Sequence, residues 1–184
     1  SPIAGSNNII AVTQSNMLYF IGNKHISWSK QLGSELIGKP VLIGNGIFLS
    51  TKSGIQGFDR AGNNLAGFPI ACNEVTSNLF SYYWNGKDYL AFVADGNAQA
   101  YGTNGKQSFR VGVNSALQKN AQLVVQGKKG ELIVHICTDS NWSSISTKRK
   151  KVIRSQNLSE GEWNLVKVNG TISLLGLSKK QFIR

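Results

Sequence analysis

The sequence is poor in cysteine, histidine, proline and acidic residues, and each shortage excludes a class of protein. The two cysteines, Cys72 and Cys137, lack CxxC spacing, and with only two histidines they argue against both a disulfide framework and a zinc site. No apolar run reaches the ~18 residues that a membrane-spanning helix needs. The chain opens at Ser1 without a start methionine or a signal peptide, so we expect it to be a piece of a longer precursor.

Acidic residues are scarce mainly in the second half of the chain. Residues 1–100 hold six Lys/Arg and five Asp/Glu, whereas residues 101–184 hold fourteen and four. Such asymmetry is typical either of a protein with an anionic partner or of a solvated basic surface that maintains solubility. Charge alone does not decide between these two interpretations.

What the sequence does contain is a hairpin of twelve residues that recurs without a gap. Each copy has an apolar strand, a turn of small polar residues such as Ser15-Asn16 or Gly96-Asn97, and an apolar or aromatic end. Gly and Asn supply the positive φ that tight hairpins require. The copies occupy residues 9–20, 47–58, 90–101 and 134–145, with a weaker fifth copy at residues 172–183.

Two further strands are predicted in each repeat, one after the hairpin and one before the next. The outer strands are predicted at residues 25–32, 64–70, 107–113 and 152–158. The preceding strands are predicted at residues 40–44, 80–84, 123–126 and 164–168, and turn signals such as Asn45-Gly46 and Asn85-Gly86 join them to their hairpins.

Four strands per repeat, joined as a meander, indicate the blade of a β-propeller. The hairpins start 38, 43, 44 and 38 residues apart, at or near the ~40–50 residues of a propeller blade. A sandwich or barrel also has many short strands, but gives no reason for a hairpin of constant length to recur. The sequence therefore predicts an all-β chain, with residues 1–184 forming one propeller domain or a propeller fragment of four to five blades. Residues 1–8 either supply a missing strand that closes a small five-bladed ring, or the chain belongs to a larger propeller.

One segment carries a family resemblance. Residues 57–69, GFDRAGNNLAGFP, resemble the aromatic-Asp-x-x-Gly and Gly-Phe-Pro signature of propeller repeats in large exported bacterial proteins. Those repeats are related to the quinoprotein-type and outer-membrane-assembly-lipoprotein-type propellers. The resemblance implies a fold rather than an activity, and by analogy an interaction platform outside the cytoplasm.

The resemblance also raises the hypothesis of a quinoprotein-type enzyme with a quinone cofactor and calcium on the propeller axis. The sequence departs from that pattern, because it lacks adjacent cysteines and has no convergent set of acids for a calcium ion. We therefore expect no enzyme activity, no cofactor and no metal. The expected function is a noncatalytic scaffold that binds a protein, another part of its own precursor, or a polymer.

Several single residues have structural interpretations that compete with functional ones. We expect His135 to be a half-buried strand residue, and Cys137 to be a small buried hydrophobe that is not bonded to Cys72. Asp59, Asp95 and Asp139 fall in turns, where carboxylates usually accept hydrogen bonds from the amides of their own loop. Three tryptophans are expected to pack between sheets, at positions 28, 84 and 163. Trp142 follows a hairpin turn, and either fills a gap between blades or protrudes.

The remaining feature is the basic string at residues 147–154, TKRKKVIR. In the repeat register it connects strands three and four of the fourth blade. In a meander this turn emerges on the same side as the turn between strands one and two. We therefore expect five cations to form one patch, which as a rival hypothesis binds a polyanion: Lys128, Lys129, Lys148, Arg149 and Lys150.

Overall fold

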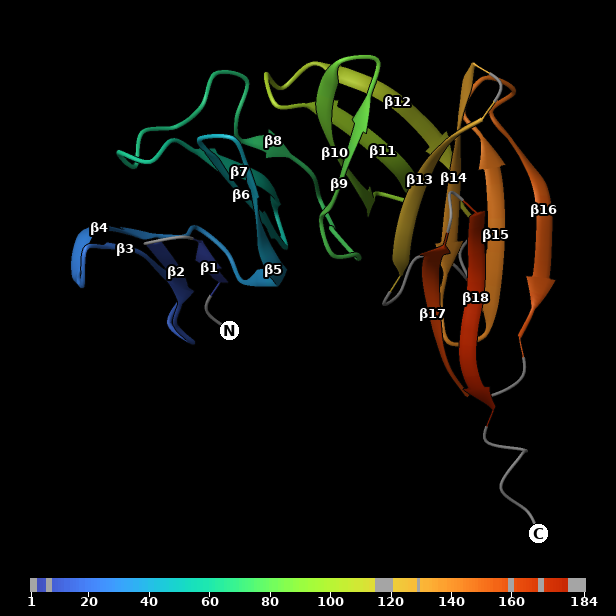
Figure 1. The fold of residues 1–184 in the computed structure, drawn as a ribbon, viewed down its shortest axis with the longest axis horizontal. Helices are drawn as coiled ribbons and strands as arrows, with labels where there is room; N and C mark the ends of the chain where they lie inside the picture. Colours follow the sequence, from blue (N-terminus) through green and yellow to red (C-terminus); the bar gives the residue numbers. More distant parts are fainter. Residues whose placement is uncertain are drawn as a thin grey trace, which may run out of the picture.

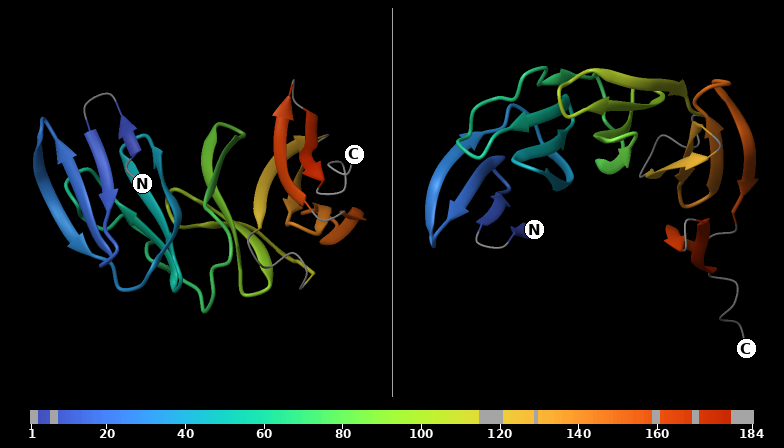
Figure 2. Two further views of the ribbon diagram at one scale, coloured as in Figure 1. Left: turned by 90° about the horizontal axis from the view of Figure 1, so that it is seen from below. Right: turned by 45° about the horizontal axis from the view of Figure 1, so that its top comes forward.

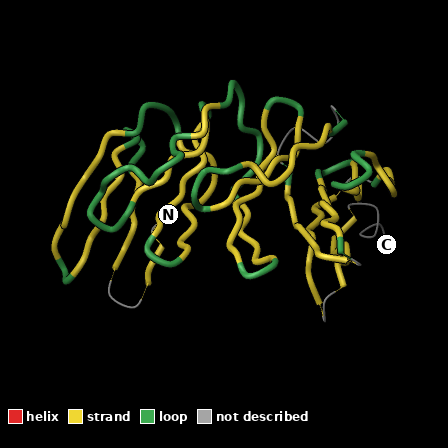
Figure 3. Tube along the Cα trace, turned by 90° about the horizontal axis from the view of Figure 1, so that it is seen from above, coloured by secondary structure: helices red, strands yellow, loops and turns green. Residues whose placement is uncertain are grey.

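The repeating strands that the sequence predicts are present in the structure, with one exception described below. The computed structural model describes residues 3–5, 8–114, 121–128, 130–158, 161–168 and 171–178. Within these residues the chain forms strands and loops and no helix (Figure 3). The strands form four sheets of four strands and one of two, and every pair within a sheet is antiparallel. The fold is an all-β propeller, as predicted.

Each sheet is one blade, and its strands follow one another in chain order as a meander. Blade 1 consists of β1 (Ile3–Gly5), β2 (Asn8–Val12), β3 (Met17–Gly22) and β4 (His25–Gln31). Blade 2 consists of β5 (Leu36–Ile43), β6 (Gly46–Thr51), β7 (Gly54–Phe58) and β8 (Ile70–Ala71). Blade 3 consists of β9 (Phe80–Trp84), β10 (Lys87–Ala94), β11 (Asn97–Gly102) and β12 (Gln107–Gly112). Blade 4 consists of β13 (Gln122–Lys128), β14 (Glu131–Cys137), β15 (Asn141–Ser146) and β16 (Lys151–Asn157), and blade 5 of β17 (Gly161–Val168) and β18 (Thr171–Ser178).

The blades follow one another around an open arc (Figures 1 and 2). Blade 1 lies at one end of the arc and β17–β18 at the other, so the described residues do not close the five-bladed ring that the sequence left open as an alternative. Strand β1 pairs with β2 and completes blade 1. The last part of the predicted fifth hairpin, residues 179–183, lies outside the described residues.

One predicted strand, residues 64–70, is wrong. The chain instead makes a single bridge between Phe58 and Asn64 and pairs again only at β8. The carboxylate of Asp59 accepts hydrogen bonds from the amides of Ala61 and Asn63, at 2.8 and 2.9 Å, and folds this segment into a turn. A capped turn competes with strand pairing because it uses the same backbone donors.

A second turn follows at once and also prevents pairing. The amide of Phe68 donates to the carbonyl of Leu65 at 3.1 Å, and Pro69 has no amide to donate to a sheet. Between them Gly67 has a φ of 82°, and a Cβ there would lie 2.5 Å from the carbonyl oxygen of Asn104 in blade 3. The Gly-Phe-Pro motif therefore brings the outer edge of blade 2 into backbone contact with blade 3.

Some turns lie one residue away from the predicted position. Asn85 and Gly86 have φ angles of 47° and 76°, as the Asn-Gly signal predicts. The turn of blade 2, however, uses Gly44 and Asn45, and Gly46 already pairs with Ile43. The hairpin of blade 1 has a longer loop than expected. Leu18, not Met17, therefore pairs with Val12 and takes the place held by Ala98 in blade 3.

Among the described residues the core consists of three apolar layers, which lie between blades 1 and 2, blades 2 and 3, and blades 3 and 4. The first joins β2 and β3 to β6 and β7, around Phe20, Ile47 and Phe58. The second contains Phe48 from blade 2 and Phe92 from blade 3. The third joins blades 3 and 4 and contains small residues of blade 3 and branched residues of blade 4: Ala91, Val93, Ala98, Ala100, Leu132, Val134, Ile136 and Ile145. Each blade thus depends on its neighbours to bury its faces.

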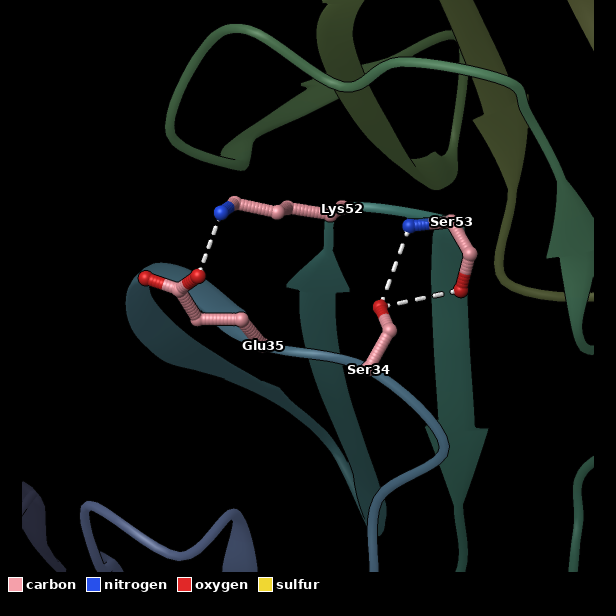
Figure 4. A network of polar contacts seen from close by, with 4 residues as sticks. All are labelled: Ser34, Glu35, Lys52 and Ser53. Carbon is pink, nitrogen blue, oxygen red and sulfur yellow. Dashed lines mark hydrogen bonds and ion pairs between the residues drawn. The ribbon is translucent and has the colours of Figure 1, made fainter.

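Polar contacts tie the links between blades to the hairpin turns. At the entry to blade 2, Lys52 forms an ion pair with Glu35, and the amide of Lys52 donates to the carbonyl of Glu35 at 2.9 Å (Figure 4). The amide of Ser53 donates to the hydroxyl of Ser34 at 3.2 Å, and the two serine hydroxyls lie 3.0 Å apart.

Blade 3 has an equivalent tie. A carboxylate oxygen of Asp95 accepts hydrogen bonds from the amides of Asn73 and Glu74, both at 3.0 Å. Asp59 caps its own loop as expected, but Asp95 caps the link that enters its blade. The carboxylate therefore fixes the position of one blade relative to the preceding segment.

Candidate functional site

Hydrogen bonds connect the two basic turns of blade 4. The hydroxyl of Ser146 donates to a carboxylate oxygen of Glu131 at 2.7 Å, and the amide of Thr147 donates to the carbonyl of Leu132 at 3.1 Å. These bonds join the β13–β14 turn to the β15–β16 turn. The exposed cations that the turns bring together are Lys128, Lys148, Arg149 and Lys150; Lys129 lies outside the described residues.

Two of these cations also line a cavity of about 600 Å³. It lies on the face of blade 4 that points toward blade 5, which we call the forward face. Most of its wall comes from blade 4, and β18 contributes Ile172. The residues around it are Gln126, Lys128, Glu131, Ile133, His135, Trp142, Ser144, Arg149, Ile153, Arg154 and Ile172.

His135 lies at the base of the cavity and is buried, with 8% of its surface exposed. Its Nδ1 lies 2.9 Å from the hydroxyl of Ser144, and its Nε2 lies 3.3 Å from Oε1 of Gln126. A neutral ring protonated at Nε2 satisfies both contacts. Burial, reinforced by the charge of Lys128, lowers the pKa of His135 to about 4. The histidine is therefore a neutral, fully hydrogen-bonded part of the sheet near pH 7.

Trp142 stacks on this histidine. Their ring centroids are 6.4 Å apart and the planes differ by 12°. The guanidinium of Arg154 lies over the indole ring of Trp142, 5.1 Å from its centre, which is within the range of a cation–π contact. Trp142 is only 8% exposed, and its indole nitrogen is buried without a hydrogen-bond partner among the described residues. Trp142 therefore does not protrude, which excludes the second of its two predicted roles, and it has one unsatisfied polar group.

The cavity has an excess of positive charge. Lys128, Arg149 and Arg154 line it, against the single carboxylate of Glu131. Among the described residues the only ion pair is that of Lys52 with Glu35 in blade 2, so none of the three cations has a carboxylate partner there. The arrangement combines hydrogen-bond donors, positive charge and apolar walls.

The sequence suggested the rim of this site but missed its base. Arg154 belongs to the basic string, yet only the register of β15 and β16 shows that it lies opposite Ser144 and beside Trp142. His135 lies on a strand, as expected, but it is buried and not half-buried. The signal that could have found the site was the hairpin alignment, in which His135 and Trp142 replace Ala91 and Ala98.

The other candidates have structural surroundings. Trp28 packs between blades 1 and 2, and its indole nitrogen donates to the carbonyl of Arg60 at 2.8 Å. Trp84 packs against the layer between blades 3 and 4. Cys72 and Cys137 are free thiols, and burial raises the pKa of each to about 11, so both are protonated and poorly nucleophilic near neutral pH.

Within the described ranges, no three His, Cys, Asp or Glu side chains lie close enough together to hold a metal ion. The same part of the chain contains no helix long and apolar enough to cross a membrane.

No protein-family model matches the sequence, and no curated protein matches it either. Solved structures do resemble the fold. Hsv2 of Kluyveromyces lactis matches with 14% identity and a TM-score of 0.63 over 95% of this chain and 56% of its own length. A protein of unknown function from Bacteroides caccae matches with 15% identity and a TM-score of 0.58, over 96% of this chain and 70% of its own.

BamB of Moraxella catarrhalis matches with 13% identity and a TM-score of 0.51, over 96% of this chain and 68% of its own. The chain thus spans a little over half the length of the Hsv2 structure. At these identities the likeness concerns the fold alone. Hsv2 and BamB are β-propellers, and this chain is a propeller that resembles the families of both.

Proposed function

We propose that this chain is a noncatalytic propeller scaffold that binds a protein or polymer partner, as a single domain or a fragment of a larger exported bacterial protein. The observation that carries the proposal is the basic end of blade 4, where Lys128, Lys148, Arg149 and Lys150 are exposed on adjacent turns. The resemblance of residues 57–69 to exported propeller repeats, and the likeness to BamB, support the location outside the cytoplasm.

The chemistry of the fourth blade supports a binding role rather than a catalytic one. His135 is neutral and hydrogen-bonded through both ring nitrogens, so it has no free site at which to accept a proton. The two thiols are protonated near neutral pH, and the described residues contain no metal-binding cluster. The quinoprotein-type alternative has no support from these residues.

Site-specific photo-cross-linking tests the scaffold function. A photoreactive amino acid at Lys148, on the β15–β16 turn, should cross-link a partner protein or polymer in the native cell. The matched control is Lys24, an exposed lysine on the equivalent turn of blade 1. A reproducible adduct from position 148 and none from position 24 supports the proposal. Equal adducts, or none from either position, would place the binding surface elsewhere or contradict it.

A second candidate, binding of a polyanion such as heparin or nucleic acid, is favoured by the convergence of the two basic turns. Binding that neutralises phosphate or sulfate groups releases counterions, so its affinity falls as salt rises. Replacing Lys148, Arg149 and Lys150 by Ser should weaken heparin binding and flatten its salt dependence without changing the unfolding midpoint. An unchanged salt slope in the triple variant would leave these cations as ordinary surface charge.

A further inference from the structure

The forward face of blade 4 departs from the pattern of the other blades. In blade 3, Ala91, Ala100 and Phe109 stand side by side on the three outer strands and pack into the apolar layer that joins the next blade. The equivalent row in blade 1 is apolar too: Ile10, Phe20 and Trp28. In blade 4 the row reads His135, Ser144 and Arg154, with the same bulge after its second residue. A simple blade interface does not require these polar residues.

The side-chain hydrogen-bond donors around the cavity include Lys128, Arg149 and Arg154. The side-chain acceptors in the wall already receive hydrogen bonds: Glu131 from Ser146, and Gln126 from His135. The indole nitrogen of Trp142 is a donor only, and a buried donor without an acceptor costs roughly 1–3 kcal/mol. Trp142 lines the cavity, so this unsatisfied donor belongs to its wall, although protein atoms cover the nitrogen itself.

Charge and size narrow the class of ligand. Three cations and one carboxylate line the cavity, and no carboxylate of the described residues pairs with these cations, so a negatively charged group is favoured there. Its volume of about 600 Å³ falls within the ~300–1,000 Å³ of small-molecule sites. Ile133, Ile153 and Ile172 supply apolar walls, and the rings of Trp142 and His135 also line the cavity.

We propose that this cavity binds a small organic oxyanion, a molecule with a carboxylate or phosphate group on a flat apolar body. The anionic group lies near Arg149 and Arg154, and the apolar body lies against the isoleucines and the indole of Trp142. This site goes beyond the proposed scaffold function: it shares Lys128 and Arg149 with the basic turns, but it would hold a small ligand inside the cavity and not a partner on the exposed rim.

Nuclear magnetic resonance of the full ¹⁵N-labelled chain tests the site directly. The four tryptophans give four indole N–H signals, and the Trp142→Phe variant identifies the relevant one. The probes are benzoate, phenyl phosphate and the neutral benzyl alcohol. We expect at least one anion to shift the Trp142 signal saturably at millimolar concentration or below, and benzyl alcohol not to. The tighter of the two anions tells a carboxylate site from a phosphate site.

Arginine variants separate a built site from general attraction to a basic protein. Arg154→Gln should weaken the bound anion about tenfold or more, as loss of a charge-assisted hydrogen bond requires. Arg110→Gln removes an exposed arginine from β12 of blade 3 and should change the affinity less than about twofold. Three results would overturn the proposal: no shift with either anion, an equal shift with benzyl alcohol, or equal weakening by both arginine variants. If the protein still bound heparin in a salt-dependent way after any of these three results, the proposed scaffold function would stand without the cavity site.

Discussion

Blades 3 and 4 have the same strand order and the same register, yet their forward faces differ in chemistry. The forward face of blade 3 is made of alanines and valines that admit the branched side chains of blade 4. The forward face of blade 4 carries a histidine, a serine and an arginine around a cavity. The comparison shows that the propeller fold fixes where side chains stand, and that each blade is free to use those positions for packing or for binding.

The two faces of the blade 4 sheet also differ in how tightly their side chains are packed. Successive residues of β14 point to opposite faces of the sheet. Ile136 therefore packs in the layer with blade 3, whereas Ile133, three residues earlier, lies on the opposite face and lines the cavity. Both isoleucines are buried. Their surroundings should nevertheless give them unequal importance for stability.

The largest expected effect contrasts these two isoleucines. Ile136→Ala should lower the free energy of unfolding by roughly 4 kcal/mol, because it leaves a void in a close-packed layer. Ile133→Ala should cost only about 2 kcal/mol, because the side chain already borders open space. Urea unfolding of both variants measures the difference. Equal losses would mean that the two faces of blade 4 are packed alike.

An exchange of residues between the two faces should have the next largest effect. Ala91→His places an imidazole in the tight layer between blades 3 and 4 and should destabilise the protein by roughly 3 kcal/mol, through overpacking and burial of a polar ring. His135→Ala removes the equivalent residue of blade 4 and should cost about 1 kcal/mol, mainly the hydrogen bond with Ser144. If thermal unfolding shows that His135→Ala is the less stable of the two variants, the forward faces of blades 3 and 4 do not differ in packing as expected.

The pH dependence of stability should give the smallest of the three effects. The pKa of His135 is about 4 in the folded chain, below its ordinary value of 6.5. Between these values the unfolded chain binds a proton that the folded chain does not, so stability falls as pH falls through this window. From pH 8 to pH 5 the loss attributable to His135 should reach roughly 2 kcal/mol.

The matched variants for this measurement are His135→Gln and His25→Gln. Urea unfolding at both pH values should show that His135→Gln loses less stability on acidification than the wild type. His25 is exposed on blade 1, and its replacement should leave the wild-type slope unchanged. If the stability of His135→Gln depends on pH as strongly as that of the wild type, His135 is not the group that causes the loss of stability on acidification.

The sequence allowed the repeat to be predicted but not the outer edge of blade 2. The hairpins could be found because apolar alternation and Asn-Gly or Asp-Gly turns are local signals. Residues 64–70 looked equally apolar, but Asp59 and Pro69 turn the chain away from the sheet. Whether this segment pairs or turns depends on how strongly the capped turn competes with strand pairing. The composition of the segment alone does not reveal the outcome of that competition.

The basic patch stays a prediction, although part of its geometry follows from the strand order. That the turns at 128–131 and 147–150 emerge together follows from the meander, and the contact of Ser146 with Glu131 agrees with it. The cavity beside them could not be foreseen. It depends on Arg154 lying over Trp142, and on Trp142 stacking on His135, three residues that share a face only after two strand pairings are fixed.

By itself the sequence determined the all-β class, the blade repeat and the excess of positive charge in the second half of the chain. These properties are local or additive, since period-two alternation, turn residues and net charge are legible without knowing which strands meet. The tertiary structure alone decided which polar residues meet. A cavity with a buried indole donor and three cations arises from side chains on β13 to β16 and β18, and their convergence depends on register and on the packing of one blade against the next.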